Sequence, residues 1–227
     1  MSDEPESIKV VLLGESGVGK TSIISQFTAH KFDPHKETSL SAQFISKTVD
    51  FPDLGQSIKF DIWDTVGQEK YRSLAKIFYK DAKVIVFVYD ITREFTFESI
   101  KNYWYEETKA DADGSPIFAV VANKIDLYTN SKVSNSDGKA YADQIGAIFQ
   151  TTSALSDSGI STLFDNIGKK NLIPGFDYTS GDKKAQEEYM KKKQEEDGNK
   201  KSRKKKENKG VKLEEGQNNE KKKKKFC

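Results

Sequence analysis

The sequence predicts an α/β domain with a six-stranded, mostly parallel sheet, one antiparallel edge strand and five helices. Three observations lead to this fold class. Strand-like apolar runs alternate with helical patterns from residue 8 to residue 172. A Gly-rich loop joins the first of these runs to the first helix. Beyond residue 173 apolar side chains become rare, so a single domain with an appended tail fits a chain of 227 residues.

The strands are read from short runs of apolar, β-branched or aromatic residues. Val10, Val11, Leu12 and Leu13 are apolar on both faces of the first strand, which is typical of a strand buried inside a parallel sheet. The turn sequence 52–56 joins two such runs and predicts an antiparallel hairpin at one edge. Six strands are therefore expected, at 8–13, 43–51, 57–63, 84–89, 117–122 and 148–151.

Helices are expected between these strands, where the helix-forming patterns occur. Two polar segments, 30–41 and 64–70, interrupt the alternation and are expected to be loops. Aromatic side chains within the helices are interpreted as core residues. The five expected helices cover 21–27, a short segment ending near residue 79, 94–109, 137–146 and 160–170.

Three regions are expected along the chain: a flexible N-terminus at 1–7, one domain at 8–172 and a disordered basic tail at 173–227. The tail carries 18 Lys and Arg against 11 Asp and Glu, whereas residues 1–172 carry 19 against 24. It cannot bury enough apolar surface to offset the entropy lost on ordering. Because the domain is mildly acidic, its composition gives no reason to expect nucleic-acid binding.

A single cysteine, Cys227, rules out a disulfide within the chain, which is typical of a reducing compartment. The polar residues 1–7 do not resemble a signal peptide. No apolar run approaches the roughly 18 residues that a membrane span needs. We therefore expect a cytoplasmic protein, or one attached to a membrane from its cytoplasmic face.

The segment Gly14–Thr21 reads G-E-S-G-V-G-K-T and matches the phosphate-binding pattern G-x-x-x-x-G-K-[ST] between a strand and a helix. Its glycines allow backbone N–H groups to turn toward phosphate oxygens, and the helix N-terminus adds its positive end. Lys20 is expected to reach the terminal phosphates, and the Thr21 hydroxyl to bind Mg²⁺. The sequence therefore predicts a nucleotide site; the alternative is a chance match.

Three further polar segments follow predicted strands. Asp64 comes directly after one strand, where a carboxylate can hold Mg²⁺, and Gly67 can offer its N–H to a terminal phosphate. In the segment Asn123–Asp126, a carboxylate at Asp126 can accept two parallel N–H bonds from guanine, whereas adenine has neither donor. After the last strand, the segment Thr152–Ala154 can offer a backbone N–H to the guanine oxygen.

The strings GESGVGKT, WDTVGQE, NKID and TSA follow the order and spacing of the Ras superfamily of small GTPases, which residues 7–172 resemble. Within it, FISKTV, KFDIWDTVGQEKYRSL and VYDIT are similar to stretches of the Rab family, and 38–44 is similar to its endosomal branch. The resemblance implies a guanine-specific, monomeric GTPase that binds GTP or GDP with Mg²⁺ and hydrolyses GTP slowly. It also implies an exchange factor, an activating protein, a GDP-dissociation inhibitor and effectors in vesicle or endosomal trafficking.

Matched position by position, the resemblance assigns roles to individual residues. Gln68 would orient the attacking water, and Thr21, Ser39 and Asp64 would bind Mg²⁺. The implied nucleotide-binding residues are Ser16, Gly17, Val18, Gly19, Lys20, Thr21, Ser22, Phe32, Ser39, Gly67, Asn123, Lys124, Asp126, Ser153, Ala154 and Leu155.

The resemblance also assigns an effector-facing surface to Phe44, Trp63 and Phe78. Partial burial in the core is compatible with that role for Trp63. Phe32 matches an aromatic residue that packs edgewise on guanine in the family, and its alternative is a core phenylalanine.

Four residues depart from the family pattern. Ser39 stands in place of a threonine, and Thr38 beside it is an alternative Mg²⁺ ligand. Ser41 replaces a glycine, Val66 replaces an alanine, and Leu155 replaces a lysine. None of these changes removes a charge or an oxygen that the chemistry needs, so we expect an active switch with altered kinetics.

The chain ends with Lys221–Lys225, Phe226 and Cys227, which resembles a Rab prenylation site. One lipid together with neighbouring lysines would hold the protein at a membrane surface. The alternative is a solvated charge run with an incidental cysteine. The basic run 200–206 leaves open a nuclear or scaffolding GTP-binding protein without a membrane cycle. A third function class is a module that binds nucleotide and effectors without hydrolysing GTP.

Overall fold

A computed structural model of the chain describes residues 4–35, 42–65, 75–111, 115–173 and 176. The chain divides into two units, Met1–Asp182 and Lys183–Cys227, and all the described residues belong to the first. They contain a six-stranded sheet with the strand order β2-β3-β1-β4-β5-β6. Its strands are β1 (Glu6–Leu13), β2 (Gln43–Phe51), β3 (Gln56–Asp64), β4 (Val84–Asp90), β5 (Ile117–Asn123) and β6 (Ile148–Thr152). The six predicted strands are confirmed, and their boundaries lie within about two residues of the expected ones.

The hairpin at the edge of the sheet has the predicted antiparallel pairing. Phe44 on β2 lies opposite Trp63 on β3, and a short 3₁₀ turn, η1 (Pro52–Leu54), connects the two strands. The other neighbouring strands pair in parallel. The mostly parallel sheet with one antiparallel edge strand is therefore confirmed.

The helices lie where the patterns predicted them, with one subdivision. The segment expected to be a helix over 94–109 runs through α3 (Glu94–Ser99), a π-helical piece η3 (Ile100–Trp104) and α4 (Tyr105–Asp111). The five predicted helices thus correspond to six labelled α-helices within the described residues. A 3₁₀ segment, η4 (Ile125–Asn130), follows β5 and was not predicted. The remaining helices are α1 (Lys20–Ala29), α2 (Ala75–Tyr79), α5 (Asn135–Gln144) and α6 (Ile160–Leu172).

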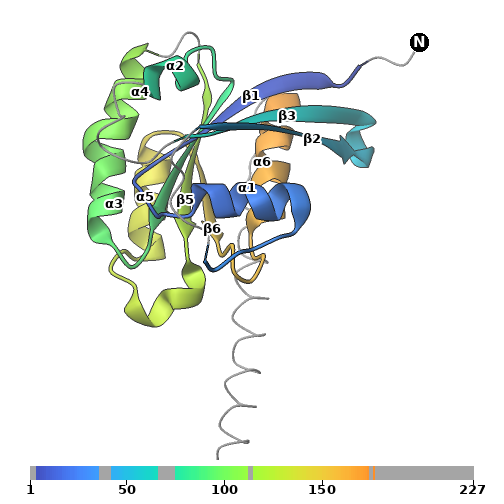
Figure 1. The fold of residues 1–227 in the computed structure, drawn as a ribbon. Helices are drawn as coiled ribbons and strands as arrows, with labels where there is room; N and C mark the ends of the chain where they lie inside the picture. Colours follow the sequence, from blue (N-terminus) through green and yellow to red (C-terminus); the bar gives the residue numbers. More distant parts are fainter. Residues whose placement is uncertain (1–3, 36–41, 66–74, 112–114, 174–175, 177–227) are drawn as a thin grey trace, which may run out of the picture. The chain divides into compact units, whose positions relative to one another are not determined.

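The sheet separates two apolar layers (Figure 1). Helices α1 and α6 cover one face, and there Phe27 and Phe164 stack with ring centroids 3.6 Å apart. Helices α3, α4 and α5 cover the other face, where Tyr89 and Trp104 are buried. Burying each large apolar side chain contributes about 1.5–3 kcal/mol. Because both faces are covered, the central strands are apolar on both sides, as the sequence predicted.

The parallel strands bring their carboxyl ends to the same edge of the sheet. The Gly-rich loop leaves β1 at this edge. Four of the five parallel strands, β3, β4, β5 and β6, end in polar residues: Asp64, Asp90, Asn123 and Thr152. Each of these side chains is at most 2 % exposed. Buried polar groups require partners, so this edge is where a functional site is expected.

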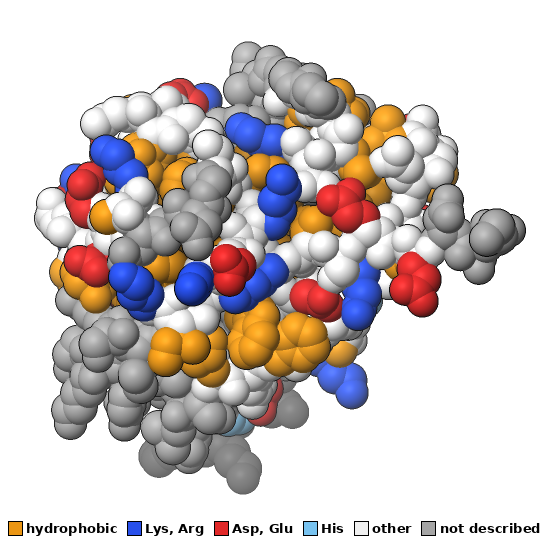
Figure 2. All heavy atoms as spheres, turned by 90° about the horizontal axis from the view of Figure 1, so that it is seen from above, with side chains coloured by type: hydrophobic (Ala, Val, Ile, Leu, Met, Phe, Trp, Pro, Cys, Tyr) orange, Lys and Arg blue, Asp and Glu red, His pale blue; other side chains and the backbone are white. Residues whose placement is uncertain are grey.

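The described surface mixes charges of both signs. In the view of Figure 2, Lys and Arg side chains alternate with Asp and Glu among hydrophobic ones, and the described residues of that face form no patch of a single charge. In the described ranges between residues 4 and 176, no helix combines the length and the apolar character that crossing a bilayer requires.

Candidate nucleotide site

The Gly-rich loop lies tightly against the ends of β4 and β5. Gly14 has a φ of +142°, and a methyl group there would lie 2.2 Å from the Val88 carbonyl oxygen. Gly19 has a φ of +99°, and a methyl group there would lie 2.4 Å from Nδ2 of Asn123. Both positions require glycine, because side chains with a Cβ would clash and rarely adopt these φ values. The close packing therefore fixes the path of the loop against β4 and β5.

Lys20 is a buried cation at the start of α1, with 5 % of its surface exposed. Its Nζ donates to the carbonyl oxygens of Gly14 at 2.8 Å and Glu15 at 3.1 Å. Burial lowers the pKa of Lys20 to about 8, against the opposing attraction of Asp64 and Glu15. A buried ammonium group gains most from a nearby anion, so the site fits a phosphate group in front of the loop.

Thr21 and Asp64 meet beside Lys20. The Thr21 hydroxyl donates to Oδ2 of Asp64 at 2.5 Å, and Asp64 is 1 % exposed. A hydroxyl and a carboxylate are the hard oxygen donors that Mg²⁺ prefers. Among the described residues no group of three or more His, Cys, Asp or Glu side chains gathers around one point. The pair fits a Mg²⁺ ion that takes its other ligands from phosphate and water, as protein-bound Mg²⁺ usually does.

Asn123 joins the Gly-rich loop Gly14–Thr21, called the phosphate loop below, to the last strand, β6. Its Nδ2 donates to the carbonyl oxygen of Val18 at 2.8 Å, and its Oδ1 accepts from the hydroxyl of Thr152 at 3.0 Å. Asn123 and Thr152 are both buried. One amide side chain therefore uses a donor and an acceptor to fix three segments that are far apart in the sequence.

Asp126 lies opposite the loop that follows β6. The Ser153 hydroxyl donates to Oδ1 of Asp126 at 2.6 Å. The carbonyl oxygen of Ala154 accepts from Nε2 of Gln26 at 2.7 Å, which ties this loop to α1. Leu155 is 58 % exposed next to them. The structure thus places Asp126 beside the loop that contains Ser153, Ala154 and Leu155, and their contacts with guanine stay a prediction.

Lys124 and Phe32 occupy the borders of this region. Lys124 has a φ of +66°, and its Nζ lies 2.7 Å from Oδ2 of Asp90. Phe32 is half-buried and packs against the core layer that includes α1 and α6. This packing agrees in part with the alternative reading of Phe32 as a core residue, and edgewise contact with a base stays a prediction.

The three predicted effector-facing aromatic residues form one cluster. The ring centroid of Trp63 lies 5.1 Å from that of Phe44 and 5.8 Å from that of Phe78. Phe44 is 53 % exposed, whereas Trp63 and Phe78 are partly buried. The neighbouring Ile77 is 70 % exposed. An exposed aromatic cluster of this kind is a candidate protein contact surface.

Several predicted residues lie outside the described ranges. They are Thr38, Ser39, Ser41, Val66, Gly67, Gln68, the lysine run 221–225 and Cys227. Among the other predicted contacts, Val18 is buried, and Ser16 and Ser22 lie in the loop and the first turn of α1.

Sequence reasoning missed four residues that support the site. Asp90 is the last residue of β4, as Asp64 is of β3. An acidic residue at the end of a predicted strand could therefore have marked Asp90 as a site residue. Arg93 donates to Asp90 and to the carbonyl oxygen of Ser16, both at 3.1 Å. Gln26 on α1 supports the loop Ser153–Leu155, and Ser99 on α3 supports the side chain of Glu15. No local pattern marks these last two side chains.

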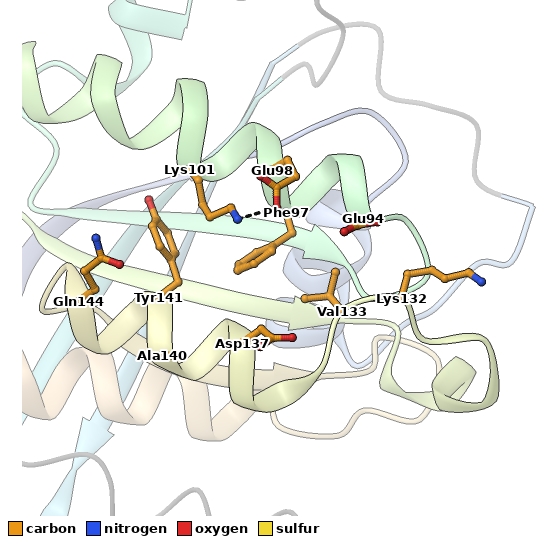
Figure 3. Close-up of a pocket in the computed structure, with 10 residues that line it drawn as sticks. All are labelled: Glu94, Phe97, Glu98, Lys101, Lys132, Val133, Asp137, Ala140, Tyr141 and Gln144. Carbon is orange, nitrogen blue, oxygen red and sulfur yellow. Dashed lines mark ion pairs between the residues drawn. The ribbon is translucent and has the colours of Figure 1, made fainter.

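A hollow of about 360 Å³ lies between α3 and α5, away from the predicted contacts (Figure 3). Phe97 and Tyr141 line it, and Lys101 on its rim pairs with Glu98 at 2.5 Å. None of the predicted nucleotide-binding residues lines this hollow.

Comparison with known proteins agrees with this geometry. A family model of the Ras family matches residues 9–172. The chain is 42 % identical to Ras-related protein Rab-22A of Mus musculus over 170 residues, which is 75 % of this chain and 85 % of that protein. It is 41 % identical to Rab-22A of Homo sapiens over the same shares. It is 39 % identical to Ras-related protein RabJ of Dictyostelium discoideum over 165 residues, 73 % of this chain and 63 % of that protein. The chain therefore belongs to the Ras family and is a Rab small GTPase, a class of enzyme that hydrolyses GTP.

Proposed function

We propose that this chain is a molecular switch that selects guanine nucleotides, binds GTP or GDP with Mg²⁺, and regulates vesicle or endosomal trafficking through effectors. The observation that carries the proposal is the position of Asn123. It links the phosphate loop at Val18 to the strand end at Thr152, directly before the loop that faces Asp126. The residues proposed to bind the phosphates and the base are thereby linked by hydrogen bonds, which supports one site for both parts of a nucleotide.

The phosphate end of the site has two proposed tasks. The backbone amides of residues 16–19, with Lys20 and Ser22, bind the phosphates. Thr21 and Asp64, together with Ser39 or Thr38, hold Mg²⁺, which neutralises charge on the transferred group. Gln68 positions the attacking water, and Gly67 senses the terminal phosphate.

The base end selects guanine. Asp126 accepts the paired N–H bonds of guanine, Lys124 and Phe32 flank the base, and the loop Ser153–Leu155 meets its oxygen. The hydrogen bond from Ser153 to Asp126 supports this assignment, because it keeps the carboxylate aimed into the loop.

The switch reaches its partners through its surface. We expect the loops 32–41 and 64–76 to be ordered by GTP and released on hydrolysis. Effectors would read the cluster of Phe44, Trp63 and Phe78, and an exchange factor, an activating protein and a GDP-dissociation inhibitor would act on a monomer. Prenylation of Cys227 beside the lysine run would attach the protein reversibly to the cytoplasmic face of endosomal or vesicle membranes.

Two measurements test the core of this proposal. Calorimetry with GDP and ADP on the full chain is expected to show GDP binding and no comparable ADP binding. Phosphate release is expected to be slow, near the roughly 10⁻⁴ s⁻¹ typical of Ras without an activating protein. Gln68→Leu is expected to lower it further. Equal release by wild type and Gln68→Leu would instead favour a module that binds nucleotide without using Gln68.

A second function class, a nuclear or scaffolding GTP-binding protein, is favoured by the basic run 200–206. A fluorescent fusion separates the two classes. Membrane localisation that is lost in Cys227→Ser supports the membrane cycle. A nuclear signal that is the same in both proteins supports the second class.

A further inference from the structure

Arg93 contacts the phosphate loop at Ser16. It lies between β4 and α3, and one of its guanidinium nitrogens, Nη2, donates to the carbonyl oxygen of Ser16 at 3.1 Å. Its Nε donates to Oδ2 of Asp90, also at 3.1 Å. The guanidinium carbon lies 5.5 Å from the centroid of the Phe95 ring, which covers it. One side chain therefore bridges the middle of the loop and the end of β4.

Asp90 is a firm anchor for Arg93, because it is 2 % exposed and has several donors. The backbone N–H and the hydroxyl of Thr92 donate to Oδ1 at 2.9 and 2.7 Å, and Nζ of Lys124 lies 2.7 Å from Oδ2. Burial alone would raise the pKa of Asp90, but the hydrogen bonds from Lys124 and Thr92 outweigh it and hold the pKa below its usual value. The carboxylate stays ionised, so it fixes the orientation of the guanidinium group.

The contact at Ser16 determines where the next amide points. In a trans peptide the carbonyl oxygen and the following N–H point in opposite directions. Because the Ser16 oxygen faces Arg93, the N–H of Gly17 points away from Arg93. The positive guanidinium also polarises this peptide group, which strengthens Gly17 as a donor.

A second contact supports the same loop from α3. The Ser99 hydroxyl donates to Oε1 of Glu15, whose side chain is 6 % exposed. Arg93 just before α3 and Ser99 at its end thus contact two successive loop residues, Ser16 and Glu15. The loop is therefore contacted at three places: Glu15 by Ser99, Ser16 by Arg93 and Val18 by Asn123.

We propose that Arg93 is a positioning residue for the phosphate end, which aims the N–H of Gly17 at the β-phosphate of bound GDP or GTP. This inference rests on the proposed nucleotide function. It requires arginine, because the guanidinium group contacts Asp90 through Nε and Ser16 through Nη2, whereas lysine has a single nitrogen that cannot occupy both positions.

The experiment uses the full chain loaded with fluorescent GDP in the presence of Mg²⁺. The rate of GDP dissociation is measured for wild type, Arg93→Ala and Arg93→Lys, with Lys139→Ala as the control. Lys139 pairs with Asp143 on the exposed side of α5, so its loss removes a cation without touching the loop. The ³¹P resonance of the bound β-phosphate and the unfolding midpoint are recorded for each protein.

We expect Arg93→Ala and Arg93→Lys to release GDP about three- to tenfold faster and to shift the β-phosphate resonance. Arg93→Lys keeps a cation for Asp90, so its unfolding midpoint is expected to stay near that of wild type. A purely structural role would lower the midpoint of Arg93→Ala and leave the resonance unchanged.

The outcomes separate this proposal from the proposed function. If wild type binds GDP and Arg93→Lys has the wild-type release rate and resonance, the positioning role is overturned and the nucleotide function stands. If wild type binds no GDP, both are overturned. If Lys139→Ala shows the same faster release and shifted resonance as Arg93→Ala, the effect comes from net charge and the positioning role is also overturned.

Discussion

The two ends of the proposed site differ in the chemical groups that they offer to a nucleotide. At the phosphate end, the loop Gly14–Thr21 offers backbone amides, and its shape depends on positions where only glycine fits. At the base end, the proposed contacts belong to side chains, above all to the carboxylate of Asp126, which accepts from the Ser153 hydroxyl. Backbone amides recognise any phosphate, whereas a placed carboxylate distinguishes one base from another. Affinity and selectivity can therefore be changed separately.

The largest expected effect concerns selectivity at the base end. Asp126→Ala removes the acceptor for guanine, so the preference for GDP over ADP is expected to fall from about 10⁴ to less than about tenfold. Displacement of fluorescent GDP by unlabelled GDP and ADP measures both affinities. Asp143→Ala, which removes an exposed carboxylate on α5, serves as the control and should keep the preference. A preserved preference in Asp126→Ala would break the proposed division between the two ends.

The next effect concerns the link between the two ends. Asn123→Ala leaves the Val18 carbonyl oxygen and the Thr152 hydroxyl without their buried partner. Its affinity for GDP is expected to fall about 100-fold, because each buried group left unsatisfied costs about 1–3 kcal/mol. Thr152→Ala removes one of the two bonds and should cost about tenfold. Equal dissociation constants for Thr152→Ala and Asn123→Ala would mean that the bond to Val18 contributes nothing.

The phosphate end should be sensitive to pH through Lys20. Its pKa in the free protein is about 8, and a bound phosphate would raise it. GDP binding at pH 9 is therefore expected to take up most of one proton, and affinity should fall up to tenfold per pH unit above 8. Calorimetry in buffers of different ionisation enthalpy measures this uptake.

The stability of the nucleotide-free protein should change in the opposite direction. The folded pKa of Lys20 lies below the ordinary lysine value of 10.5, so the unfolded state binds more protons between pH 8 and 10.5. This residue therefore makes the free energy of unfolding rise with pH in that window. Denaturant titrations should show that Lys20→Met removes this contribution. An unchanged slope in Lys20→Met would contradict the assignment to this residue.

The smallest expected effect concerns the loop Ser153–Leu155, which Gln26 on α1 contacts at Ala154. Gln26→Leu removes the bond from Nε2 to the Ala154 carbonyl oxygen, and also a buried Oε1 that has no hydrogen-bond partner among the described residues. The two effects partly offset each other, so we expect a change in unfolding free energy of about 1 kcal/mol or less and about threefold faster GDP release. Thr28→Val, which removes a bond within α1, should leave the release rate unchanged. Wild-type release by Gln26→Leu would show that Ala154 is positioned without α1.

The sequence was most informative where a local pattern carries the structure. The apolar strands and the loop between β1 and α1 were predicted because burial on both faces and glycine spacing leave a signal in adjacent residues. The π-helical segment η3 was not predicted, because a helix with one wider turn keeps nearly the same pattern of apolar residues. The short η4 was also missed, since six residues are too few for a periodic signal.

The sequence by itself determined the order of strands and helices, the phosphate loop and the polar residues at the strand ends. The tertiary structure alone decided which of these residues support one another. Asn123 reaches a residue 105 positions away, Gln26 one 128 positions away, and Arg93 one 77 positions away. Such contacts depend on the strand order, which is set by non-local pairing and by the covering of both sheet faces. Local residue patterns describe one element at a time, so they place donors and acceptors at an edge of the sheet without pairing them.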